Sequence, residues 1–321
     1  PRPSSYRPWT FHTAANGVMA LCGEFAPDVV HSQLELADVV GQMVAMKFHL
    51  PHVITFHNTH WWAVRNVASH WRIAYRKYWL RRGRPSFVAV SRAAACAAAN
   101  ALGIDDKNIT VVHNGIDLSQ FLPCRWLKDG APPARTWQLL CVGRLEHVKG
   151  QDVLIRALAS DELQQQSMHL LLVGDGTARP DLQCLVDELG LSHKVSFLGI
   201  RQDIPGLLAA SDIYIQPSRS EGLSNALIEA LAAGLPVVVT EVPGMLEVLT
   251  ANGAAGLGSV VPCNDPVSLA AAISPYLHDP LECRRQARLA KECASQFSIE
   301  TIAQRMENIY VTTMSRSSFQ S

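Results

Sequence analysis

The 321-residue sequence lacks a surplus of charge of either sign, because Lys plus Arg and Asp plus Glu both total 28. A balanced chain gives no indication of nucleic-acid binding, which depends on an excess of cations. No apolar run reaches the roughly 18 residues that a membrane-spanning helix needs, and no signal-peptide pattern is visible. The charge is unevenly placed, however: residues 1–120 carry 12 basic and 7 acidic side chains, a net charge of +5.

The sequence also lacks paired cysteines. Its eight cysteines are scattered, and no C-x-x-C pair occurs. Scattered cysteines in a large chain are typical of a reduced, cytoplasmic protein and exclude a disulfide framework or a zinc site. No D-x-D motif is present either, so we expect no metal site.

What the sequence does contain is a regular alternation of short apolar runs and longer helical patterns. Hydrophobic residues make up 48% of the chain and charged residues 17%, which indicates an ordered globular protein. Strand–helix alternation predicts an α/β fold with two Rossmann-like, doubly wound parallel sheets. The expected strands are residues 28–32, 52–57, 86–91 and 109–114, then 138–143, 169–174, 194–199, 212–217 and 236–240.

The length predicts two domains. We expect an acceptor-side domain over residues 1–120, a proline-containing linker at 121–137, a second Rossmann-like domain at 138–296, and a C-terminal helix and tail at 297–321. Two α/β domains joined in this way would form a cleft lined by the loops at the carboxyl ends of the strands.

One acidic residue stands out in the stretch Pro217–Thr240. Glu229 lies in a nearly continuous apolar run from Ala226 to Leu235, and Glu221 precedes that run beside Gly222. A carboxylate among apolar side chains needs a partner, since isolated burial of a charge is costly. An internal salt bridge and a ligand hydroxyl would each satisfy it. The helix that begins near Ser224 also offers an anion site at its free N-terminus.

A second cluster follows the strand at 138–143. Gly143, Arg144 and Lys149 lie in a turn that precedes a helix. Two cations beside a helix N-terminus suit a diphosphate, although basic residues in a turn are also commonly just solvated. A third strand ends at Gly174 in a G-D-G turn, which alone is weak support for a binding site.

In this order, the motifs VGRLEHVKG, LLLVGDG, VSFLG and SEGLSNALIEALAAGLPVV resemble the donor-binding domain of the retaining family 4 glycosyltransferases, also called group 1. Glu221 and Glu229 match the E-x7-E motif of that family. The segments DVVHS, HVITFHNTHWW, FVAVSRAAA and VVHNGIDLSQF resemble its acceptor-side half. The similarity spans roughly residues 25–300 and implies the GT-B fold.

The resemblance implies a role for each matching residue. Glu221 would bind hydroxyls of the donor sugar, Glu229 would bind the ribose, and His57 would lie near the reacting sugar. His60 and His31 are weaker candidates. The diphosphate would be held by Arg144 and Lys149, together with the turns at Gly143 and Gly174 and the main-chain N–H groups of Gly222, Leu223 and Ser224. No cofactor and no metal are implied, because these cations replace a metal at the leaving phosphate.

The implied activity is transfer of a hexose from a nucleotide-diphosphate sugar to a glycan or lipid-linked acceptor, with front-side displacement and retention. Two alternatives stay open: a partner-dependent nucleotide-sugar-binding subunit, and another GT-B enzyme such as a sugar-nucleotide epimerase. The family's first strand and Gly-rich loop find no match before Asp28. We therefore expect the first domain to lack its first βαβ unit, which would leave Val29 and Val30 on an open sheet edge.

The basic segment 70–85 contains an aromatic stripe, Trp71, Tyr75, Tyr78 and Trp79, flanked by arginines. Such a helix can lie on an anionic membrane surface, so peripheral contact at the inner face of a membrane is one expectation. The other is an aromatic stripe packed in the core with a solvated basic edge.

Overall fold

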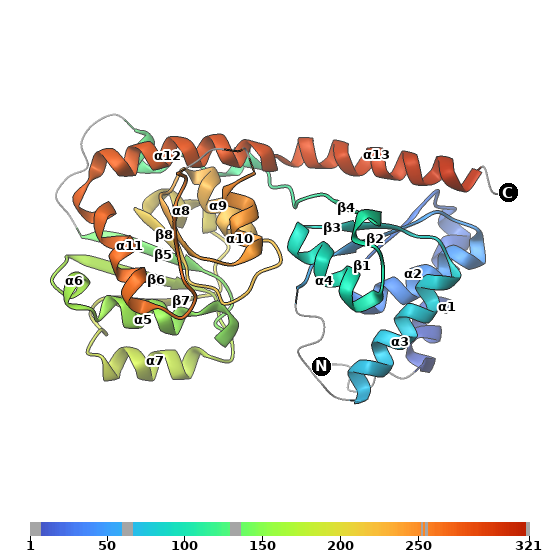
Figure 1. The fold of residues 1–321 in the computed structure, drawn as a ribbon, viewed down its shortest axis with the longest axis horizontal. Helices are drawn as coiled ribbons and strands as arrows, with labels where there is room; N and C mark the ends of the chain where they lie inside the picture. Colours follow the sequence, from blue (N-terminus) through green and yellow to red (C-terminus); the bar gives the residue numbers. More distant parts are fainter. Residues whose placement is uncertain (1–7, 60–66, 129–135, 252, 254–255, 319–321) are drawn as a thin grey trace. The chain divides into compact units, whose positions relative to one another are not determined.

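The computed structural model describes residues 8–59, 67–128, 136–251, 253 and 256–318. The chain divides into two compact units: residues 1–113 together with 302–321 form unit 1, and residues 114–301 form unit 2. Figure 1 shows each unit as a parallel sheet with helices packed around it. Two α/β units with parallel sheets are the predicted fold class.

Unit 1 contains four described strands in the order β1-β2-β3-β4, all parallel: β1 (Val30–Gln33), β2 (His52–Phe56), β3 (Ser86–Ala89) and β4 (Ile109–Val111). The helices between them are α2 (Glu35–Phe48), α3 (Val67–Arg82) and α4 (Arg92–Leu102). α4 begins and ends where its sequence dictates, since Ser91 caps its N-terminus and Gly103 adopts a left-handed conformation at its C-terminus.

The N-terminal part of unit 1 contains a helix that the sequence analysis did not predict. α1 (Pro8–Phe25) packs against α2, and Phe11 and Ala15 join Val39 and Met43 in one buried cluster. β1 lies at the edge of the described sheet, as the sequence predicted. Val30, the first residue of β1, and the preceding Val29 are half-buried because their side chains pack against apolar clusters.

The last helix of the chain belongs to unit 1 rather than forming a separate tail. From α13 (Ile299–Ser318), Ile302 is buried with Val53, Val88 and Val112 of the unit 1 sheet region. The hydroxyl of Tyr310 is hydrogen-bonded to His31 at 2.8 Å. The C-terminal segment thus completes the core of the unit in which the chain begins.

Unit 2 contains a six-stranded parallel sheet in the order β10-β9-β8-β5-β6-β7. Its strands are β5 (Trp137–Val142), β6 (Met168–Val173), β7 (Val195–Gly199), β8 (Ile213–Gln216), β9 (Val237–Thr240) and β10 (Ser259–Val261). All except β10 were predicted. This is the Rossmann strand order, in which the chain winds outward in both directions from the central pair β5 and β8.

Helices cover the sheet of unit 2. The helices are α5 (Gln151–Leu158), α6 (Asp161–Gln164), α7 (Arg179–Glu188), α8 (Ile204–Ala210), α9 (Asn225–Ala233), α10 (Pro243–Leu249), α11 (Pro266–His278) and α12 (Pro280–Ala294). α5 packs against α7 and α11, whereas α9 packs against α8, α10 and α12.

The described part of the predicted linker, residues 121–128 and 136–137, packs against unit 2. Cys124 and Trp126 are buried in the core of unit 2, and Arg125 forms an ion pair with the buried Asp212 at 2.5 Å. Apolar side chains and a compensated charge therefore attach this segment to unit 2. The division between the units falls between His113 and Asn114 instead.

Candidate active site

Two loops meet in unit 2 at the point where the strand order reverses. The loop after β5 and the loop after β8 leave the carboxyl ends of neighbouring strands, which is where open α/β sheets bind ligands. Arg219 joins the two loops: its main-chain N–H donates to Val148 O at 2.8 Å, and its guanidinium pairs with Asp152 at 2.7 Å. The residues on these loops are thereby held in one place.

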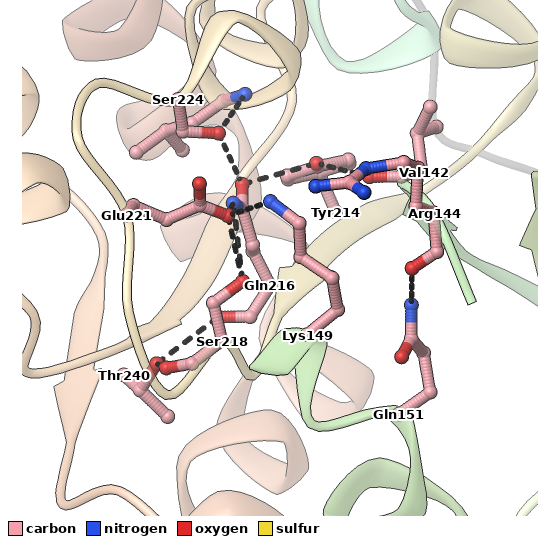
Figure 2. A network of polar contacts seen from close by, with 11 residues as sticks. Val142, Arg144, Lys149, Gln151, Tyr214, Gln216, Ser218, Glu221, Ser224 and Thr240 are labelled. Atoms are coloured by element: carbon pink, nitrogen blue, oxygen red, sulfur yellow. Dashed lines mark hydrogen bonds and ion pairs between the residues drawn. The ribbon is translucent and has the colours of Figure 1, made fainter. Parts of the chain in front are cut away.

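Glu221 lies at the centre of this site, with a side chain that is only 9% exposed. Three donors converge on one of its carboxylate oxygens, Oε1: Lys149 Nζ at 2.6 Å, Gln216 Nε2 at 2.7 Å and Ser218 Oγ at 2.8 Å (Figure 2). The other oxygen, Oε2, accepts no hydrogen bond within the described residues. The network therefore fixes the carboxylate and leaves one oxygen available to a ligand.

A second layer of hydrogen bonds orients Gln216. Its Oε1 accepts from Ser224 Oγ at 2.8 Å and from Tyr214 OH at 3.2 Å. With both acceptor sites used, the amide must present its NH2 group to Glu221. Tyr214 of β8 and Ser224, the N-cap of α9, therefore fix the orientation of the amide (Figure 2).

The N-terminus of α9 opens toward the same loop. Ser224 is its N-cap and accepts from Leu227 N at 3.2 Å. The main-chain N–H groups of Leu223 and Ser224 donate to no group in the described part of the chain. Unpaired N–H groups at a helix start attract anions. Gly244 lets α10 approach this loop, because a Cβ there would lie 2.3 Å from Gly222 O.

Glu229 lies one helical turn beyond this N-terminus and is half-buried. Burial raises the pKa of its carboxyl group. Within the described residues it forms no ion pair or hydrogen bond, so the internal salt bridge considered from the sequence is not found there. A half-buried carboxylate without a protein partner is a candidate ligand contact.

The two cations of the β5 loop differ in their surroundings. Lys149 is bound to Glu221, whereas the exposed Arg144 forms no ion pair within the described residues. Gln151 Nε2 donates to Arg144 O at 2.9 Å and fixes its main chain. In Figure 2 the Arg144 side chain extends toward the Lys149–Glu221 pair. The loop thus offers one anchored cation and one available cation.

The glycines at the strand ends serve the packing of the loops. Gly174 has φ of 129°, and a Cβ there would lie 2.0 Å from Gly143 O. The N–H groups of Gly143 and Gly174 donate to Val173 O and Gly199 O, respectively. These two glycines therefore bring neighbouring loops together, and their N–H groups are already used by the protein.

His57 belongs to unit 1, where it follows the carboxyl end of β2. Its Nε2 is buried and has no hydrogen-bond partner among the residues that the structure describes, and burial lowers the pKa of the imidazole. His31 lies within β1 and is hydrogen-bonded to Tyr310 and Thr55, both at 2.8 Å, which indicates a structural role. His60 lies outside the described residues.

The aromatic stripe of α3 is partly packed and partly exposed. Tyr75 packs against Phe11 with tilted rings at a centroid distance of 5.2 Å, whereas Trp71 and Tyr78 are 37% and 51% exposed. The basic edge is not simply solvated, because Arg76 is buried against Asp38 and Arg72 pairs with Glu35. No helix in the described part of the chain is long and apolar enough to cross a bilayer.

The sequence analysis missed Gln216 and Ser218. Both are buried and both hold Glu221. A signal was present, since Gln216 is the amide that ends β8 directly after Ile213, Tyr214 and Ile215. Its side-chain partners lie within eight positions in the chain, but they belong to a loop and a helix start whose path the sequence alone does not show.

Comparisons with known proteins place both units in one group. Residues 125–293 match the family model for glycosyl transferases group 1, and residues 1–120 match the model for glycosyltransferase family 4. Glycogen synthase from Mycobacterium tuberculosis is 30% identical over 296 residues, which cover 89% of this chain and 69% of that protein.

Two further matches extend the comparison. The lipopolysaccharide core biosynthesis mannosyltransferase LpcC from Rhizobium leguminosarum is 30% identical over 213 residues, or 63% of this chain and 59% of that protein. Among solved structures, HepE from Anabaena in complex with UDP-glucose has a TM-score of 0.77 and 25% identity, and the match covers 93% of this chain and 82% of that chain.

Proposed function

This chain belongs to the group 1 glycosyl transferases, hexosyltransferase-type enzymes of the GT-B fold, and we propose that it moves a hexose from a nucleotide-diphosphate sugar to a glycan or lipid-linked acceptor with retention of configuration and without a metal ion. The observation that carries the proposal is the fixed Glu221 carboxylate beside Lys149, Arg144 and the N-terminus of α9. This arrangement combines a hydroxyl acceptor with an anion site.

Each part of the site suits one part of the donor. The diphosphate binds Arg144, the N–H groups of Leu223 and Ser224, and Lys149, whose ammonium has three donors and can keep its bond to Glu221. The free oxygen of Glu221 accepts a hydrogen bond from a sugar hydroxyl. Glu229 accepts from the ribose hydroxyls, which compensates its half-buried charge.

The chemical step follows from these charges. The bond between the anomeric carbon and the β-phosphate oxygen breaks, and negative charge grows on that phosphate. Fixed cations and unpaired N–H groups stabilise the growing charge more in the transition state than in the ground state. The acceptor hydroxyl attacks from the side that the phosphate leaves, which gives retention, and its proton passes to the departing phosphate. We assign His57, neutral because its pKa is lowered, to the acceptor side.

The acceptor is less closely defined than the donor. The relatives named above include a glycogen synthase and a lipopolysaccharide mannosyltransferase, which supports both glycan and lipid-linked acceptors. The exposed Trp71, Tyr78 and Arg81 of α3 support peripheral membrane contact through residues 70–85. A cytoplasmic location stays a prediction.

A thermal-shift panel of nucleotide sugars tests the donor assignment, because a ligand that binds only the folded protein raises its melting temperature. UDP-glucose is the first compound to use, since the HepE complex contains it. We expect a shift that is unchanged by chelator and lost in Arg144→Ala. Strict dependence on Mg²⁺ or Mn²⁺ would contradict the phosphate roles of Arg144 and Lys149. Binding without sugar transfer to any acceptor would support a binding subunit instead.

A further inference from the structure

Unit 1 has a large cavity at the amino-terminal ends of its strands, whereas His57 follows the carboxyl end of β2. The cavity has a volume of about 1410 Å³. The starts of three strands line it. The lining residues there are Pro51, which precedes β2, His52 of β2, Ser86 of β3 and Thr110 of β4. His57 follows the other end of β2, about 16 Å away for a five-residue strand. The cavity is therefore separate from the carboxyl-end loops of this sheet.

Four cations from four different segments line this cavity. Arg82 ends α3, Arg84 precedes β3, Lys107 lies in the short helix before β4, and Arg316 lies in the last turns of α13. No aspartate or glutamate is among the described residues that line it. Segments that are more than 200 residues apart in the chain thus contribute charge of one sign to one concave surface.

These four cations carry no compensating carboxylate in the part of the chain that the structure describes. Within the described residues, none of the four forms an ion pair, although Arg82 lies over the ring of Tyr78 at 4.6 Å. Two other arginines of α3 are compensated, Arg72 by Glu35 and Arg76 by Asp38. A concave site lined by one sign of charge focuses its field and concentrates counter-ions of the opposite sign.

The lining chemistry indicates which anion fits. Three of the four cations are arginines, whose planar guanidinium group binds phosphate oxygens in a bidentate manner. Asn108 and Asn308 add amide donors, and Met46, Leu80 and Phe87 add apolar surface. A volume of this size is above the usual range for small-molecule sites, roughly 300–1,000 Å³, so it can hold a phosphate together with an organic group.

We propose that this cavity of unit 1 is a second binding site, specific for phosphate groups and distinct from the donor site of unit 2. The phosphate group is carried by a free phosphorylated compound or by a lipid headgroup. Because the site lies in unit 1 and needs no donor, it does not depend on the proposed sugar transfer.

Titration of the full chain with inorganic pyrophosphate in a calorimeter tests the proposal. The variant Arg84→Gln/Arg316→Gln removes two cavity cations. The control variant Lys47→Gln/Arg305→Gln removes two exposed cations of α2 and α13 that do not line the cavity. Both variants keep Arg144 and Lys149, so any pyrophosphate binding at the donor site is the same in the two. We expect the cavity variant to lose roughly tenfold or more in affinity for the additional site, and the control variant to keep it.

A vesicle arm distinguishes the two sources of phosphate. Co-sedimentation with vesicles of phosphatidylglycerol and phosphatidylcholine is compared with vesicles of phosphatidylcholine alone. Loss of binding to the anionic vesicles in the cavity variant, and not in the control, identifies a lipid headgroup. Loss of pyrophosphate binding alone identifies a free phosphorylated compound. If cavity and control variants bind both probes equally, the proposal is wrong.

Discussion

At the scale of single residues, the site depends on how each carboxylate is compensated. Glu221 receives three donors on one oxygen, whereas Glu229 receives none within the described residues. The first arrangement fixes a side chain before a ligand arrives, and such preorganisation lowers the cost of binding. The second leaves a half-buried charge whose compensation depends on the ligand.

Because Glu229 has no partner within the described residues, its substitution should affect donor binding without lowering the stability of the protein. Burial raises its pKa, so the folded protein holds this proton more tightly than the unfolded chain, and the ionised form disfavours folding at neutral pH. We expect Glu229→Gln to keep or raise the melting temperature without ligand and to weaken UDP-glucose binding about 10- to 100-fold, the value of a hydrogen bond to a charged group. Thermal melts and calorimetry measure the two effects.

Glu188→Gln is the control, because Glu188 is exposed on α7. It should change neither the melting temperature nor the affinity. A marked loss of stability in Glu229→Gln with normal donor binding would show that Glu229 stabilises the protein rather than binding the donor.

Substitution of Gln216 should lower both the stability of the protein and the rate of sugar transfer. Gln216→Leu removes one donor from Glu221 and leaves the hydroxyl of Ser224 without its acceptor. We expect a stability loss of about 1–3 kcal/mol for unsatisfied buried groups and a fall in kcat of about tenfold with little change in KM. Steady-state kinetics and urea denaturation measure these quantities.

Gln286 provides the matched control for this variant. It is also buried, and it bonds to the main chain of Gly256 and Gly258 on another side of unit 2. Gln286→Leu should lower stability by a similar amount and leave kcat unchanged. Equal loss of kcat in both variants would mean that Gln216 acts only through stability.

At the scale of elements, α2 and α3 are joined by a buried ion pair between Asp38 and Arg76. Burial raises the pKa of Asp38 to about 6, although Arg76 and the hydroxyl of Ser32 oppose the shift. The folded state therefore binds this proton more tightly, and the contribution of Asp38 to stability falls as the pH rises from about 4 to about 6.

Removal of the cation should make this pH dependence steeper. We expect Arg76→Met to cost about 3–5 kcal/mol at pH 7, because it leaves a buried charge without compensation. The loss should shrink at pH 5, where Asp38 becomes protonated. Urea denaturation at the two pH values measures the change. Arg72→Met is the control, since the half-exposed pair with Glu35 should contribute no more than about 1 kcal/mol. A loss that does not depend on pH would contradict this account.

At the scale of the whole molecule, the chain begins and ends in the same unit. Ile302 of α13 is 5% exposed and packs with Val53, Val88 and Val112. We expect Ile302→Ala to destabilise unit 1 by about 2–5 kcal/mol, the usual cost of a buried cavity. Unit 2 should be unaffected, because its core contains none of these residues.

Hydrogen exchange can distinguish the two units in this variant. Amides of β2 and β3 should exchange faster, while those of β8 and α9, and the thermal shift with UDP-glucose, should stay unchanged. Val311→Ala is the control on the same helix, since Val311 is 52% exposed. Faster exchange in α9 would show that the two units unfold together.

The sequence by itself determined the local order of this protein. Short apolar runs predicted nine of the ten described strands, because a strand buried on both faces must be apolar along its length. β10 was missed, since its apolar run consists only of Val260 and Val261, between Ser259 and Pro262. The segments Arg144–Lys149 and Glu221–Glu229 were recognised because a loop and the helix that follows it are continuous in the chain.

Only the tertiary structure decided which side chains meet. It placed Lys149 on Glu221, 72 residues away, and oriented Gln216 between Ser224 and Glu221. It also assigned the buried Trp126 to unit 2 and the end of the chain to unit 1. The physical reason is that hydrogen bonds and packing act over a few ångströms in space, whereas sequence patterns report only periodicity along one element.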